Sequence, residues 1–198
     1  MRTLTSYIAC ILLVCSANRC MAQEAVSKKP AKTARFILYA GLGPNFYFNN
    51  LVLAKDEVNE FNYAFVARFM WEPEYFLSIG FETGYNKLYT VSAGKGTANE
   101  LHIVNAAIPL QGVVSMKFLK HFYGNFTMGQ SILLNKVSRA NKEDDKATTF
   151  SLSDFGLAFG YRKPVGEKWY LGTELKGYYS TKLNDKNIGL VFMAGYRF

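Results

Sequence analysis

Large apolar residues alternate with small or polar ones through most of the sequence after residue 34. The stretch 61–71 shows this plainly: aromatic residues or Ala67 occupy every odd position, while residues such as Asn62 and Arg68 fall between them. Successive side chains of a β-strand point to opposite faces, so a period of two indicates a strand with one apolar face. The stretch 61–71 is therefore predicted to be a strand with two unlike faces.

Seven further segments repeat this period, which gives eight predicted strands. They lie at about 34–44, 75–86, 104–117, 122–134, 154–162, 169–179 and 188–198. Most of these segments have about ten residues or more, the length that a tilted membrane-spanning strand requires. An even number of strands also suits a closed barrel with both ends on one side.

The predicted connections alternate between short and long. Three are short (72–74, 119–121 and 163–168), and four are longer and polar (45–60, 87–100, 135–149 and 182–187). Aromatic residues flank the short-turn side: Trp71, Tyr75, Phe118, Phe122, Tyr161, Trp169, Tyr196 and Phe198. Short periplasmic turns, long external loops and an aromatic belt are typical of a barrel in the outer membrane.

Side-chain volume indicates which face points outward. An eight-stranded barrel has an interior just wide enough for its own side chains, and the large residues of the apolar face would overfill it. The opposite face is rich in Gly, Ala, Ser and Asn, which suit a narrow wet interior. The alternative, a soluble lipocalin-like barrel, would have the reverse arrangement. We therefore predict an all-β fold, an eight-stranded antiparallel up-and-down transmembrane β-barrel.

Charged residues on the predicted inner face form the candidate site. The lumen charge network is predicted to contain Arg68, Glu82, Asp154, Arg162, Glu174, Lys176 and Arg197. A turn centred near residue 165 would set Asp154 across from Lys176 as a buried ion pair. Glu82 and Glu174 would lie near mid-height. We expect these charges to plug the lumen; the alternative is a narrow, gated ion path.

The N-terminus resembles a targeting segment. Residues 1–22 combine Arg2, a short apolar stretch and a small residue at Ala22, which predicts a cleaved secretory signal peptide. The alternative is a lipoprotein signal, although the residues before each cysteine fit a lipobox poorly. Residues 23–33 would form a periplasmic lead-in, and 34–198 the barrel. All three cysteines fall within 1–22, so the remainder has no thiol for a disulfide or metal site.

Net charge and histidines narrow the function classes. The formal charge is +8, and the positive residues are scattered, which argues against nucleic-acid binding and favours contact with anionic lipid head groups. His102 falls on the lipid face of its strand and His121 in a periplasmic turn, neither with a serine at a recognisable motif spacing. We expect no catalytic site, no metal and no cofactor.

The strands and the C-terminal residues Phe192, Ala194, Tyr196 and Phe198 resemble the OmpA-like/OmpX-like outer-membrane β-barrel superfamily, particularly its porin-family outer membrane protein β-barrel domains. The resemblance covers about 34–198. It implies a Gram-negative outer-membrane location and makes these four residues an assembly signal that the barrel-assembly machinery reads.

Within such a superfamily, fold says little about function. We expect a monomer with a non-enzymatic role, either structural or in surface interaction through its external loops with a ligand that the sequence does not identify. A narrow small-solute pore is the alternative, and a lipid A-modifying enzyme is the second alternative.

Overall fold

The computed structural model describes residues 34–48, 57–73, 76–94, 101–139 and 142–198. The predicted signal peptide (1–22) and lead-in (23–33) lie outside the described residues. Among the described residues, no helix is long and apolar enough to cross a membrane.

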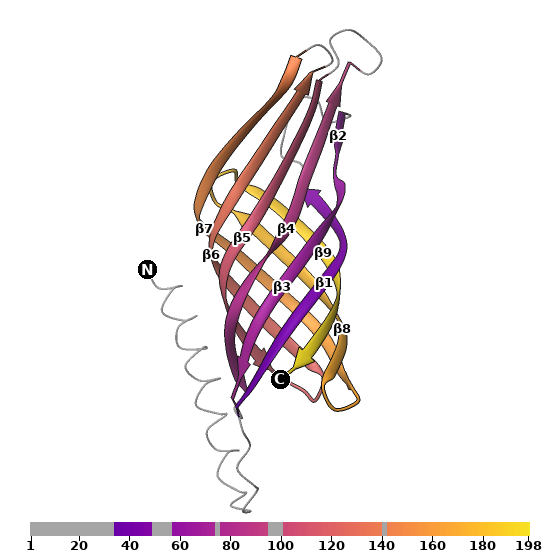
Figure 1. The fold of residues 1–198 in the computed structure, drawn as a ribbon, viewed down its shortest axis with the longest axis vertical. Coiled ribbons are helices and arrows are strands. Elements are labelled where there is room, and N and C mark those ends of the chain that lie inside the picture. Colours follow the sequence, from indigo (N-terminus) through magenta and orange to yellow (C-terminus); the bar gives the residue numbers. More distant parts are fainter. Residues whose placement is uncertain (1–33, 49–56, 74–75, 95–100, 140–141) are drawn as a thin grey trace, which may run out of the picture. The chain divides into compact units, whose positions relative to one another are not determined.

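Eight long antiparallel strands close into a barrel (Figure 1). They are β1 (Arg35–Phe48), β3 (Phe61–Glu72), β4 (Leu77–Ala93), β5 (Leu101–Lys117), β6 (Phe122–Arg139), β7 (Lys142–Val165), β8 (Trp169–Ser180) and β9 (Asp185–Arg197). A two-residue strand, β2 (Val58–Asn59), pairs with β4. The order around the ring is β4-β3-β1-β9-β8-β7-β6-β5, and pairing of β5 with β4 completes it. The predicted fold class is confirmed.

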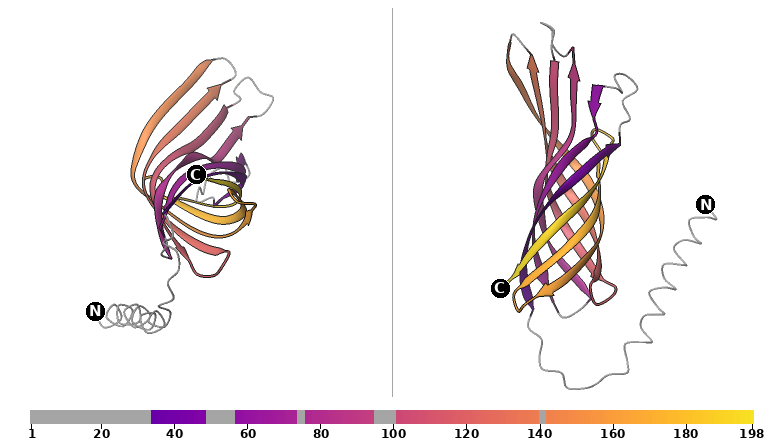
Figure 2. Two further views of the ribbon diagram at one scale, coloured as in Figure 1. Left: turned by 60° about the horizontal axis from the view of Figure 1, so that its bottom comes forward. Right: turned by 90° about the vertical axis from the view of Figure 1, so that its right-hand side faces the viewer.

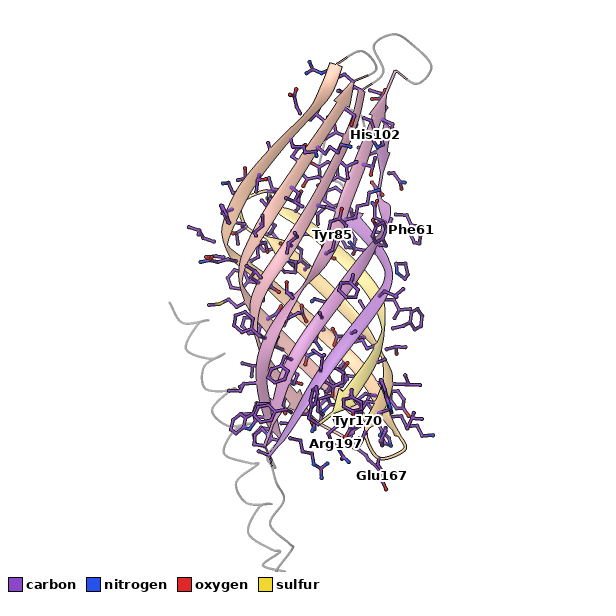
Figure 3. All side chains as sticks on the ribbon, in the orientation of Figure 1. Phe61, Tyr85, His102, Glu167, Tyr170 and Arg197 are labelled. Carbon is purple, nitrogen blue, oxygen red and sulfur yellow. The ribbon has the colours of Figure 1, made fainter. Side chains whose placement is uncertain are left out.

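The apolar face of the strands points outward, as side-chain volume predicted. Phe61, Phe81 and Leu157 are 66%, 62% and 67% exposed, whereas Arg68 and Glu82 on the alternate positions are 3% and 1% exposed. The inner face is mostly polar: Asn, Ser, Thr and charged side chains fill the narrow lumen. Tyr170, labelled near the lower end of the barrel in Figure 3, packs against a buried apolar cluster that includes Ile37 and Met193.

Strands β4 to β7 are longer than the others at one end of the barrel. We call this the loop end, and the opposite end, with the β3–β4, β5–β6 and β7–β8 connections, the turn end. β7 has 24 residues, whereas β8 has 12, and Figure 2 shows the taller strands rising past the rest of the rim.

All four predicted long loops have wrong boundaries, because strands continue into each of them; β1, for example, continues to Phe48 inside the predicted loop 45–60. β4 continues to Ala93 inside 87–100, where Ser92 pairs with His102, and much of 135–149 is strand, with Ser138 paired to His102 and Thr148 to Leu134. β9 also begins at Asp185, inside the predicted loop 182–187. The extension of β4 has polar Lys87, Thr90 and Ser92 on its outer face and apolar Leu88 inside, and 135–149 is largely polar. Neither stretch therefore shows the apolar outer face by which the other strands were predicted, and cross-strand pairing stabilises them instead.

The turn between β7 and β8 lies two residues later than predicted. Val165 pairs with Trp169, and Gly166 adopts a φ of 72°, a left-handed conformation that favours glycine. The register therefore sets Lys176 opposite Ala158. The predicted ion pair between Asp154 and Lys176 is wrong.

Candidate functional site

A buried ionic cluster crosses the barrel at mid-height. Arg68 on β3 donates from Nε and Nη2 to Glu82 Oε2, at 2.8 and 2.5 Å. It also donates from Nη1 and Nη2 to the two carboxylate oxygens of Glu174, both at 2.8 Å. Glu82 lies directly across the β3–β4 ladder, whereas Glu174 belongs to β8, three strands away around the ring. One guanidinium thus connects distant parts of the barrel wall.

Three further side chains complete this central cluster. Lys176 Nζ forms an ion pair with Glu82 Oε1, and Tyr123 and Asn125 donate to Glu174 Oε2 at 3.0 and 2.8 Å. Two cations and two carboxylates, all buried, therefore balance in charge. Loss of one partner from such a cluster strongly destabilises the folded protein, because it leaves a buried charge unpaired.

A second cluster closes the turn end. Glu72 forms ion pairs with Arg162 at 2.6 Å and Lys117 at 2.7 Å, and Tyr39 donates to Glu72 at 3.4 Å. The Arg162 guanidinium also lies 5.5 Å from the ring centroid of Tyr39 and 5.1 Å from that of Tyr123, which suits cation–π contact. The lumen is thus bridged at a second level.

Hydroxyl groups surround Asp154 at the loop end. Its carboxylate accepts from Tyr178 at 2.6 Å, from Ser151 at 2.5 Å and from the backbone N–H of Thr181 at 3.1 Å. Nearby, Tyr47 and Leu88 belong to a buried apolar cluster. We call it the loop-end cluster: Tyr47, Leu88, Ala107, Leu133 and Tyr178, with Tyr89 packed against it.

The seven predicted network residues therefore separate into groups. Arg68, Glu82, Glu174 and Lys176 meet in the central cluster, Arg162 belongs to the turn-end cluster and Asp154 to the loop end. Arg197 is half-buried, and among the described residues its side chain makes no ion pair.

Sequence reasoning missed Glu72 and Lys117. Glu72 was interpreted as part of a turn, and Lys117 as one polar inner position among many, although both point inward by parity. That parity was the available signal. Tyr39 and Tyr123 were missed because a tyrosine on the small-residue face gives no sign of its partner until the register is known.

Some inward polar groups have no protein partner. Gln111, Thr127 and Ser78 are each at most 1% exposed, and no described residue hydrogen-bonds their side-chain polar atoms. Buried polar groups are ordinarily satisfied, so these positions suit water inside the lumen. Among the described residues, no group of three or more His, Cys, Asp or Glu side chains could hold a metal.

A polar cleft lies on the outer wall near the loop end. Its volume is about 710 Å³, and its lining residues are Glu57, Val58, Asn59, Lys87, Thr90, Ser92, Gly94 and His102. Ser92 Oγ lies 3.0 Å from His102 Nδ1 across the β4–β5 ladder. No motif in the sequence indicates this pair, because ten residues separate its members. Figure 3 shows His102 high on the wall, beyond Tyr85 and Phe61.

The tall part of β7 has an open edge. Its pairing with β8 begins at Phe155, so residues 142–154 have no strand on that side among the described residues. Lys182 Nζ donates to the Phe150 carbonyl at 3.1 Å, which shows that this carbonyl points to the open side. Unpaired strand edges present backbone groups to which another strand can bond.

Solved structures of small β-barrels are similar to this fold. One is Ail, the attachment invasion locus protein of Yersinia pestis, in complex with the heparin analogue sucrose octasulfate, with a TM-score of 0.57 and 11% identity. Another is a major outer membrane protein from Thermus thermophilus, with a TM-score of 0.58 and 13% identity. Each alignment covers 84% of this chain and 100% of the other. At these identities the likeness concerns the fold.

No family model matches the sequence, and no curated protein matches it.

Proposed function

We propose that this protein is a non-enzymatic outer-membrane barrel that contacts a partner outside the cell through the long strands β4 to β7 at the loop end. The apolar exterior supports membrane insertion, since side chains such as Phe81 and Leu157 would otherwise face water. The similar solved barrels include an outer membrane protein and an attachment protein, which supports the same location and class of role.

The open edge of β7 is the main observation that supports the surface role. The edge spans thirteen residues, 142–154, and no described strand pairs with it, whereas natural sheets usually keep exposed edges short or covered. An extended segment of a partner protein would add to this edge as a further strand, with main-chain hydrogen bonds supplying affinity.

The lumen clusters support a structural rather than a conducting role. Arg68 bonds carboxylates on two strands and the turn-end cluster bridges the barrel again, so an ion would have to displace buried ion pairs twice. We expect no steady conductance in planar bilayers.

The pair Ser92 and His102 is the observation that favours a lipid-modifying enzyme as a second candidate. In a serine–histidine–carboxylate triad, however, Nε2 faces the serine and Nδ1 bonds a carboxylate. Here Nδ1 faces Ser92, and no described carboxylate bonds the ring. An unchanged lipid A mass spectrum in cells with and without the protein would remove this candidate.

A proline substitution tests the surface role. Thr148 is two residues from Phe150, so its N–H points to the same open side and takes no part in the β6 ladder. Thr148→Pro removes this donor, whereas Thr148→Val keeps it. Because 23–198 contain no cysteine, Lys146→Cys would provide a single site there for a photo-cross-linker on intact cells.

We expect cross-linked partner with the cysteine variant alone and with added Thr148→Val, and its loss with added Thr148→Pro. Equal cross-linking in both double variants would refute the role of the edge. Recovery of the chain as a soluble periplasmic species would refute the membrane location itself.

A further inference from the structure

An extra residue in β4 turns polar side chains to the outside of the barrel. The register between β4 and β5 shifts between Lys87 and Tyr89. Leu88 and Tyr89 both pack in the loop-end cluster inside the barrel, so two consecutive residues point inward. The outward row therefore continues from Lys87 to Thr90 and Ser92, which strict alternation would have placed inside.

Thr90 places a buried hydroxyl group in the cleft. It is 6% exposed and lines the cleft, yet its hydroxyl has no hydrogen-bond partner among the described residues. A buried hydroxyl without a partner is uncommon because it forfeits its hydration. A ligand in the cleft would supply the missing bond.

The other lining groups indicate the chemistry of that ligand. Lys87 supplies a cation, and Ser92 and His102 supply further polar groups on the same face. A cation beside hydroxyl donors suits a phosphate ester, which offers several strong acceptor oxygens. Glu57 also lines the cleft, and its carboxylate would accept hydrogen bonds from the hydroxyl groups of a sugar rather than contact the phosphate.

Below the cleft, the outer wall changes from polar to apolar. Lys87 Nζ lies 5.9 Å from the ring centroid of Tyr63, which stacks on Tyr85 at 5.9 Å. Phe65 and Phe81 follow toward the turn end and are exposed. Tyrosines with a neighbouring lysine are typical of a membrane interface, and phenylalanines of the acyl-chain region.

We propose that the cleft binds the sugar-phosphate head group of a phosphorylated glycolipid whose acyl chains lie along this apolar wall. The site rests on the membrane location proposed above. Lys87 and Thr90 hold the phosphate, and Glu57 accepts hydrogen bonds from sugar hydroxyls.

Native mass spectrometry of the detergent-solubilised full barrel tests the site. The titrants are monophosphorylated lipid A and the same glycolipid without its phosphate. We expect the phosphorylated form to bind at least tenfold more tightly. Lys87→Met should remove about that factor, the equivalent of one charge-assisted hydrogen bond. Lys163→Met, an equal charge change at the turn end, should leave binding unchanged.

Thr90 distinguishes a binding role from a structural one. Thr90→Val deletes an unpartnered hydroxyl at nearly constant shape, so it should leave the unfolding midpoint unchanged or raise it, yet weaken lipid binding several-fold. Thr90→Ser should retain binding.

Three results would overturn the proposal. The first is equal affinity for the two lipids, and the second is unchanged lipid binding by both Lys87→Met and Thr90→Val. The third is glucosamine 1-phosphate binding as tightly as the lipid, which would indicate a soluble phosphate ester. Because the titration is done in detergent, it measures lipid binding at the cleft whether or not the protein inserts into the membrane in cells.

Discussion

Replacing Arg68 with methionine should sharply destabilise the barrel. Arg68→Met keeps much of the aliphatic stem but removes four hydrogen bonds and the cation shared by Glu82 and Glu174. Breaking a buried ion pair by removing one partner costs about 3–5 kcal/mol. Lys176 still faces Glu82, and Tyr123 still donates to Glu174, so we expect the lower limit, about 3 kcal/mol.

Urea titration of the barrel in detergent micelles measures this loss. Trp71 and Trp169 report unfolding by fluorescence, and gel mobility with and without heating reports the closed barrel. With an m-value of about 2 kcal/mol per molar urea, the midpoint should fall by about 1.5 M. Arg197→Met is the matched control: its guanidinium makes no ion pair among the described residues, so its midpoint should stay near wild type.

A double variant separates charge from packing. Adding Glu174→Gln to Arg68→Met neutralises a carboxylate that has lost its one ion-pair partner among the described residues. The double variant should therefore be less destabilised than the sum of the two single changes. If Arg68→Met shifted the midpoint no further than Arg197→Met, or if the two changes were additive, the central cluster would not be the coupled unit described above.

Two further predictions concern packing and assembly. In Gly195→Ala, the new Cβ would lie 2.4 Å from a carbon of the Tyr39 ring, which should cost about 1–3 kcal/mol in urea unfolding, whereas Gly177→Ala has 3.8 Å of clearance and should be neutral; equal midpoints would contradict this. Phe198→Ala keeps the backbone bond to the Phe36 carbonyl but removes the terminal ring, so it should reduce the heat-modifiable fraction in cells, and a wild-type fraction would argue against the assembly signal.

The sequence predicted which residues lie inside and outside the barrel from two facts. Period-two alternation fixes the two faces of each strand, and a narrow lumen cannot hold the larger set. Arg68 and Glu82 could therefore be placed inside from parity alone. Their contact could not be predicted, because it depends on how β3 and β4 are aligned.

Alignment also explains the predictions that failed. A shift of two residues in the β7–β8 turn left Asp154 with hydroxyl partners and gave Lys176 to Glu82. The extensions of β4 to β7 lack the apolar outer face of the other strands, so they were predicted as loops. Neither error is visible in the strands themselves, since the register of a strand depends on the connecting turn and on pairing with neighbouring strands.

Hydrophobic alternation is a local property of each strand, so the amino-acid sequence was enough to predict a membrane-type barrel with a polar, charged interior. The closed fold was needed to show which charges meet, which edge of β7 stays open and which side of the wall Thr90 faces. Partners in a barrel are set by closure of the whole ring, and one bulged residue at Leu88 changes the direction of every side chain that follows it in β4.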